Sequence, residues 1–220
     1  SRTFTMTNVA DNITGSSGDD LFIGDTISIN SFDRIDGLGG VDVFKVFDFF
    51  IAAISPLPVI TNVETIYFVR LENADQNFTA LAQSTTGINR IEIGNASPLN
   101  GKTITTTSGQ SLSLSTYGIA TDGAVTWAAS ATDTALNLTL DNYQGSADVV
   151  SPSTLTITGA AATTLNIDSI GAINQIGTFT GPATVKNHVI KGDQPLLYTL
   201  AAADVAALDL VFAGAHYDPA

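Results

Sequence analysis

Apolar and polar residues alternate along most of this chain in short segments, a pattern typical of β-strands with one buried face. From residue 60 onward such segments recur roughly every 8 to 15 residues, among them ETIYFV, NRIEI, SLSLST, ALNLTLD and STLTITG. Gly, Asn, Asp, Ser or Pro separate them. This spacing leaves no room for crossover helices, so the pattern predicts an all-β fold.

Both a β-sandwich and a β-solenoid are compatible with short alternating strands. Hairpin dipeptides are sparse, with Asn-Gly at Asn100 and Asp-Gly at Asp122. The phrase TLTI at 154–157 returns in similar form, TLNI, at 164–167, which favours stacked rungs. Only NFTALAQST, from residue 77, and TLAAADVAALDL, from residue 199, look helical, and we expect both to be connectors.

The N-terminal part contains an internal repeat with an offset of 22 residues, which aligns segment 11–23 with segment 33–45. Short repeats of this kind are typical of stacked units that cannot bury their apolar face alone. The identical pairs are Asp11 with Asp33, Ile13 with Ile35, Gly15 with Gly37, Gly18 with Gly40, Asp20 with Asp42, and Phe22 with Phe44.

Each copy fits the calcium-binding RTX nonapeptide G-G-x-G-x-D-x-U-x, although Ser16 and Leu38 replace the second glycine. In this motif the first six residues form a turn whose carbonyls and aspartate offer oxygen ligands, and a short strand with a buried apolar residue follows. Phe22 and Phe44 are the expected buried residues. An offset of 22 is about two nonapeptides plus four residues, so segment 24–36 can supply the opposite turn and strand.

Calcium takes about six to eight oxygen ligands, so one such turn cannot complete its shell and a stacked neighbour is needed. We therefore predict one Ca2+ between the Gly15 and Gly37 turns, with Asp20 and Asp42 as leading carboxylate ligands. The competing interpretation is that these are ordinary Asp-Gly turns between strands. The full set of candidate metal-site residues is Gly15, Gly18, Asp19, Asp20, Asp25, Asp33, Asp36, Gly37, Gly40 and Asp42.

The charge of the chain favours cations as partners. It has 21 acidic and 8 basic residues and a pI near 4.1, which argues against nucleic acids and anionic lipids. The first 48 residues hold 8 of the 21 acids, a density that a bound cation would relieve. There is no cysteine, and the apolar run 49–63 is short and contains two prolines, so we expect no membrane insertion.

With these features the sequence resembles bacterial surface-layer proteins and RTX-type adhesins exported by type I secretion. The likeness rests on the RTX pair, the phrase ITNVETIYF at 60–68, and the Thr- and Ala-rich strand phrases LTITGAAATTLNIDS and VIKGDQPLLYTLAAADVAALDLV. It implies a right-handed parallel β-helix, a β-solenoid with an N-terminal RTX-like calcium β-roll element and little helix. The motif's turn glycines correspond to Gly15, Gly18, Gly37 and Gly40, and its aspartates to Asp20 and Asp42.

We divide the chain into RTX-like calcium-binding repeats at 1–48 and a β-helical region at 49–220 that continues them, and we expect both to belong to a longer chain. The resemblance implies a calcium-dependent structural protein of the bacterial cell surface, which folds outside the cell and self-associates. A cell-surface polysaccharide is a further possible partner, and nucleic acid is not expected.

Catalysis is not expected. The two histidines, His188 and His216, do not form an H-E-x-x-H zinc motif, and no G-x-S-x-G sequence occurs. The alternative function is a carbohydrate-binding or polysaccharide-acting β-helix. For it, a face with Glu64, Glu92, Arg70 and Arg90, or stacking by Trp127, Tyr117 and Tyr143, provides the candidate residues, whereas His188 is expected at the surface.

Overall fold

In the computed structural model, the described residues are 1–47, 58–70, 76–77, 85–94, 101–115, 124–143, 154–159, 161–200 and 209–212. Every helix or strand assigned within these ranges is a β-strand. None of the described segments is a helix long and apolar enough to cross a membrane. The all-β prediction is therefore confirmed.

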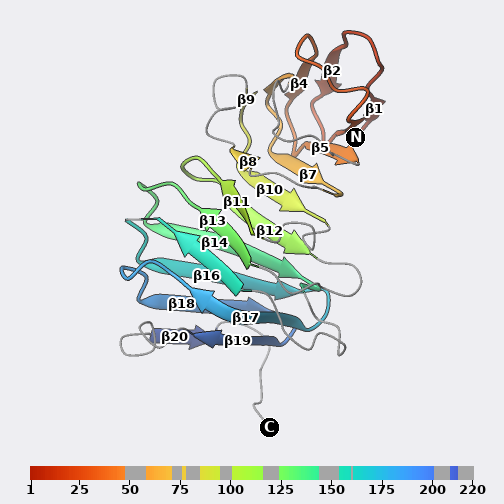
Figure 1. Cartoon of the computed structure of the whole chain (residues 1–220). Coiled ribbons are helices and arrows are strands. Elements are labelled where there is room, and N and C mark those ends of the chain that lie inside the picture. Colours follow the sequence, from red (N-terminus) through yellow and green to blue (C-terminus); the bar gives the residue numbers. More distant parts are fainter. Residues whose placement is uncertain are drawn as a thin grey trace.

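The strands form a parallel β-solenoid, in which the chain coils and each turn adds a rung to the stack (Figure 1). One sheet runs through the whole stack and has ten strands. In spatial order they are β1 (Thr3–Thr5), β3 (Leu21–Asp25), β5 (Val43–Phe47), β7 (Thr65–Phe68), β10 (Arg90–Ile93), β12 (Ser111–Ser115), β14 (Ala135–Asp141), β16 (Thr164–Ile170), β18 (Asn187–Gly192) and β20 (Asp209–Phe212).

Two shorter sheets supply the other side of the coil, a four-stranded one at the N-terminal rungs and a six-stranded one after it. The four-stranded sheet contains β2 (Asn12–Ser16), β4 (Arg34–Leu38), β6 (Val59–Thr61) and β9 (Thr85–Thr86). The six-stranded sheet contains β8 (Gln76–Asn77), β11 (Lys102–Thr105), β13 (Ala124–Ala128), β15 (Thr154–Thr158), β17 (Asn174–Thr180) and β19 (Leu196–Leu200).

Apolar residues at alternating positions fill the space between the sheets in columns that follow the strand register. Phe22 pairs with Phe44, Phe44 with Ile66, and Ile66 with Ile91. Leu112, Leu138 and Ile167 continue this column through the C-terminal rungs. All seven side chains are almost completely buried. Because like residues stack on like, each rung buries the apolar face of the previous one.

The sequence reading was wrong for parts of the two helical segments. Thr85–Thr86 form β9, residues 199–200 belong to β19, and residues 209–210 belong to β20. Residues 78–84 and 201–208 of these segments lie outside the described residues. Helix propensity is a weak local preference, which an available strand edge overrides because it offers backbone hydrogen bonds and burial together.

Three ring-bearing residues are buried rather than exposed. Trp127 is 0% exposed and donates its Nε1 hydrogen to Thr106 Oγ1 at 2.9 Å, and Tyr143 is 1% exposed. His188 is also 1% exposed, and its ring meets Phe179 edge-on with centroids 5.0 Å apart. The predictions that Trp127 and Tyr143 stack on sugars and that His188 lies at the surface are therefore wrong, and Tyr117 lies outside the described residues.

Candidate functional site

The acidic repeat stacks in register at the N-terminal end of the solenoid. Strand β2 pairs with β4 and β3 with β5, each with an offset of 22 residues, so one repeat is one complete rung. Gly15 and Gly37 lie inside strands β2 and β4 rather than in turns, which corrects the motif-based assignment. Asp20 and Asp42 immediately precede strands β3 and β5, so their carboxylates lie one above the other.

The Asp20 carboxylate accepts hydrogen bonds from its own turn and from the preceding rung. Its side chain is 3% exposed. Oδ2 accepts the Ser16 backbone N–H at 2.5 Å, and Oδ1 accepts the Arg2 backbone N–H at 2.6 Å and the Ser16 hydroxyl at 3.0 Å. Burial raises the pKa of Asp20, but the hydrogen bonds from Ser16 and Arg2 outweigh it and bring the pKa below its ordinary value.

The same contact continues along the stack through Asp42 and Glu64. The Asp20 backbone N–H donates to Asp42 Oδ1 at 2.7 Å, and the Asp42 backbone N–H donates to Glu64 Oε2 at 2.7 Å. Glu64 was not among the predicted metal-site residues, although its separation from Asp42 repeats the 22-residue interval that identified the others. Three consecutive rungs thus carry a column of acidic side chains.

Asp42 differs from Asp20 in having one unpartnered oxygen. Asp42 is 0% exposed, and its Oδ2 is a buried side-chain oxygen with no hydrogen-bond partner. Leu38 occupies the position in the second repeat that Ser16 occupies in the first. The Ser16 backbone N–H donates to Asp20, whereas the Leu38 backbone N–H donates to Asp36 Oδ1 at 3.0 Å and not to Asp42. Leu38 adopts a positive φ of 68°. Burial, together with the charges of Glu64, Asp20 and Asp19, therefore raises the pKa of Asp42.

The opposed pKa shifts predict a stability maximum at mildly acidic pH. A raised folded-state pKa means that charged Asp42 costs stability at neutral pH and that the cost disappears as the pH falls through that pKa. The lowered pKa values of Asp20, Asp25 and Asp36 act in the opposite direction, because their contribution is lost as the pH falls below about 4. In EDTA, we expect the melting temperature to rise as the pH falls from neutral towards the ordinary aspartate pKa of about 4, and to fall below it.

Asp42→Asn separates the two effects, because it retains the shape of the side chain without the charge. We expect this variant to melt higher than the parent at neutral pH and to show no rise in melting temperature as the solution is acidified. Differential scanning calorimetry across the pH range measures both curves. If the melting temperature of the parent protein only falls as the pH is lowered from neutral, the negative charge of Asp42 does not destabilise the fold, and this assignment is contradicted.

The other predicted carboxylates also accept backbone N–H groups. Asp33, at the opposite corner of the rung, accepts from Asp11 at 2.9 Å and from Asn30 at 2.7 Å. Asp19 accepts from Val41 at 2.8 Å. Asp25 accepts from Ile27 and Ser28, and Asp36 accepts from Leu38 and from the Asn62 side chain. The aspartates therefore cap the turns of the solenoid, and each of the six uses at least one oxygen to do so.

Amide side chains take over this capping role in later rungs. Gln110 accepts the Thr107 backbone N–H at 2.9 Å and donates to the carbonyl of Ile88 at 3.2 Å. Asn174, which is 0% exposed, accepts the Tyr143 backbone N–H at 2.6 Å. Sequence reading did not identify either residue, because the rungs here have unequal lengths and no repeat aligns them.

The four predicted glycines are not equivalent. A Cβ at Gly15 would come within 2.6 Å of the Gly37 carbonyl oxygen, and one at Gly37 would overlap both the Asn62 carbonyl oxygen and Asp42 Oδ2. Gly40 has a φ of 122° and abuts the backbone of the preceding rung. Gly18 has open space, since its nearest neighbour would be Ser1 N at 3.7 Å. Three of the four positions therefore require glycine for close stacking.

The donor set fits calcium only in part. Within the described ranges, no group of three or more His, Cys, Asp or Glu side chains is arranged to hold a metal ion. Among the described residues, the one buried carboxylate oxygen that lacks a partner is Asp42 Oδ2, which borders the same space beside Gly37 as the Asn62 carbonyl oxygen. Both are hard oxygen ligands of the kind that Ca2+ uses. Calcium binding thus stays a prediction, with Asp42 as its focus.

Comparison with protein-family models, with curated proteins and with solved structures finds no match for this chain. The likeness to surface-layer proteins and RTX adhesins therefore rests on the sequence motifs alone.

Proposed function

We propose that this chain is a structural segment of an extracellular bacterial surface protein, of the surface-layer or adhesin kind, whose N-terminal rungs are stabilised by calcium. The observation that carries the proposal is the stacked acidic repeat. Its two copies form consecutive rungs, and its carboxylates form the Asp20–Asp42–Glu64 column. A rigid rod of this kind suits a spacer or a building block better than an enzyme.

Calcium acts on folding in this proposal. The column places negative charges in adjacent rungs, and one of its oxygens, Asp42 Oδ2, is buried without a partner. A cation bound there satisfies that oxygen and offsets the repulsion from Asp19, Asp20 and Glu64. Because the unfolded chain has no such site, the binding free energy adds to the stability of the folded rungs. Folding is then favoured outside the cell, where calcium is abundant.

Self-association belongs to the same role. Among the described strands, β1 is the terminal one of the ten-stranded sheet and pairs with β3 alone, on one side. An uncovered end of a solenoid offers backbone N–H and C=O groups to a further strand. A second copy of the chain can continue the stack there, as the rungs continue one another inside the molecule.

The test is a thermal melt of the chain by circular dichroism in EDTA, in millimolar magnesium and in millimolar calcium. We expect calcium, but not magnesium, to raise the melting temperature, and we expect Asp42→Ala to abolish the increase. The same samples in sedimentation velocity are expected to contain larger species in calcium. Asp133→Ala is the matched control, because Asp133 also caps a turn, through Gly109 N–H at 3.1 Å, but lies outside the repeat.

The control variant is expected to melt lower than the parent by the same amount in EDTA and in calcium. Equal melting temperatures of the parent in EDTA and in calcium would refute the calcium part of the proposal. In that case the aspartates would serve only as turn caps. A calcium effect that survives in Asp42→Ala would move the site elsewhere on the solenoid.

A further inference from the structure

A polar groove of about 330 Å³ lies on the outer face of the ten-stranded sheet, across strands β10 to β18. Its lining includes Arg90, Ser111, Asn137, Thr139, Asn166 and Asp168. Leu138 also borders it but turns its side chain into the core, where it is 1% exposed. Polar side chains and backbone therefore form the surface of the groove, and its volume is at the lower end of the range for ligand pockets.

The strand register arranges these side chains in two columns that run along the solenoid axis. In one, Arg90 is level with Ser111, and on the next two rungs Asn137 is level with Asn166. The other contains Glu92, Ser113, Thr139, Asp168 and Lys191. Rungs of a sheet are about 4.8 Å apart, so the groove presents a polar side chain at regular short intervals.

The charged groups beside the groove are paired with one another. Arg90 Nε lies 2.5 Å from Glu92 Oε1, and Lys191 Nζ lies 3.3 Å from Asp168 Oδ2. Two positive and two negative side chains thus balance on a chain whose net charge is -13. Neither a strong anion nor a strong cation finds an uncompensated charge here, so the groove favours an uncharged ligand with many hydroxyl groups.

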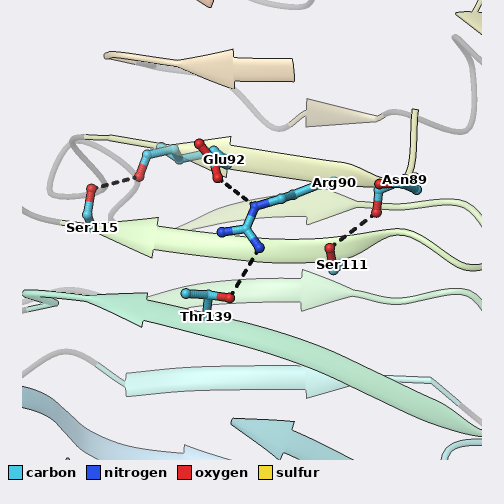
Figure 2. A network of polar contacts seen from close by, with 7 residues as sticks. Asn89, Arg90, Glu92, Ser111, Ser115 and Thr139 are labelled. Atoms are coloured by element: carbon cyan, nitrogen blue, oxygen red, sulfur yellow. Dashed lines mark hydrogen bonds and ion pairs between the residues drawn. The ribbon is translucent and has the colours of Figure 1, made fainter. Parts of the chain in front are cut away.

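The guanidinium of Arg90 and the amides of Asn137 and Asn166 still have donors and acceptors that such a ligand can use. Figure 2 shows the Arg90 guanidinium reaching across the rungs between Glu92 and Thr139, with Nη1 3.5 Å from Thr139 Oγ1. A guanidinium has five N–H donors, and of these only the Nε donor makes a short contact with a residue that the structure describes. Asn166 Nδ2 donates to Asn137 Oδ1 at 3.0 Å, which leaves the Asn137 amide hydrogens and Asn166 Oδ1 for a ligand.

We propose that this groove binds an extended, uncharged polysaccharide strand that lies along the solenoid axis. Sugar hydroxyls both donate and accept, as the amides of Asn137 and Asn166 do, and Arg90 supplies further donors. The two columns present a polar side chain on successive rungs, so an extended chain of sugars can meet several of them in turn. The site is separate from the acidic repeat, and it does not depend on calcium binding there.

The test is isothermal titration calorimetry of the full chain with linear hexasaccharides. The neutral probes are hexamers of β-1,4-linked glucose, β-1,4-linked mannose and α-1,6-linked glucose, and the anionic probe is a galacturonate hexamer. We expect at least one neutral hexamer to bind at millimolar concentration or below, with an affinity that does not change with salt. The Asn137→Ala/Asn166→Ala variant is expected to bind it about tenfold more weakly, a loss of about 1.4 kcal/mol.

Two further variants separate binding from folding. Arg90→Lys retains the positive charge beside Glu92 but lacks the planar fork, and we expect several-fold weaker binding with an unchanged melting temperature. Gln175→Ala removes a partly exposed amide on β17, in the opposite sheet, and is expected to bind like the parent. The proposal is overturned if no neutral hexamer binds at millimolar concentration, or if the groove variants bind like the parent. Preferential, salt-sensitive binding of the galacturonate hexamer would also overturn it.

Discussion

Gly40→Ala is expected to destabilise the N-terminal rungs by about 3 kcal/mol or more. Gly40 has a φ of 122°, a conformation that side chains with a Cβ rarely adopt. A Cβ there would also stand 2.6 Å from Gly18 C and 2.7 Å from Asp19 N, which are backbone atoms of the preceding rung. Because backbone cannot move aside as a flexible side chain can, the two rungs must separate.

Hydrogen exchange measured by mass spectrometry, with a thermal melt beside it, checks this expectation. Loss of protection is expected in strands β2 to β5, while the C-terminal rungs keep theirs, because stability in a solenoid is local. Gly18→Ala is the matched control from the same repeat, since a Cβ at Gly18 would meet only Ser1 N at 3.7 Å. Equal loss of protection in the two variants would contradict the stacking argument.

Phe44→Ala is expected to cost about 4 kcal/mol, the range measured when a buried aromatic ring is removed from a core. Phe44 is 0% exposed and is stacked in register between Phe22 and Ile66. Its removal leaves a cavity in the middle of a column, and rungs on both sides lose contacts. Urea denaturation, followed by circular dichroism, measures the loss of the free energy of unfolding.

Phe47→Ala is the control on the same strand. Phe47 is 37% exposed, and Lys45 Nζ lies 5.2 Å from the centre of its ring. Removing a partly exposed ring and one cation–π contact is expected to cost about 1 kcal/mol. If Phe44→Ala cost no more than Phe47→Ala, the column of Phe22, Phe44 and Ile66 would not be a packed core.

Much of the fold follows from local patterns in the sequence. Alternation of apolar and polar residues predicts strands, and the 22-residue repeat predicts that Phe22 stacks on Phe44 and Asp20 on Asp42. The first inference succeeds because side chains of a strand point alternately to its two faces. The second succeeds because rungs of equal length place residues 22 positions apart at the same height. They weaken where the rungs become unequal, as between Asn137 and Asn166, which are level with each other but 29 residues apart.

The acidic site illustrates the same limit. The sequence presents Asp20 and Asp42 as equivalent ligands, yet Asp20 has both oxygens hydrogen-bonded and Asp42 has one without a partner. The difference arises from Leu38, whose backbone N–H faces Asp36 instead of Asp42. The direction of one backbone N–H group thus separates the two aspartates.

The sequence by itself therefore determined the class of fold, the rung length at the N-terminus, the buried phenylalanines, and Asp20 and Asp42 of the acidic column. Only the tertiary structure decided that the aspartates cap turns through backbone N–H groups, and that Arg90 and Thr139 meet across rungs. The physical reason is that strand patterning is a local property of adjacent residues. Hydrogen-bond partners and grooves depend on which distant residues the register brings to the same height.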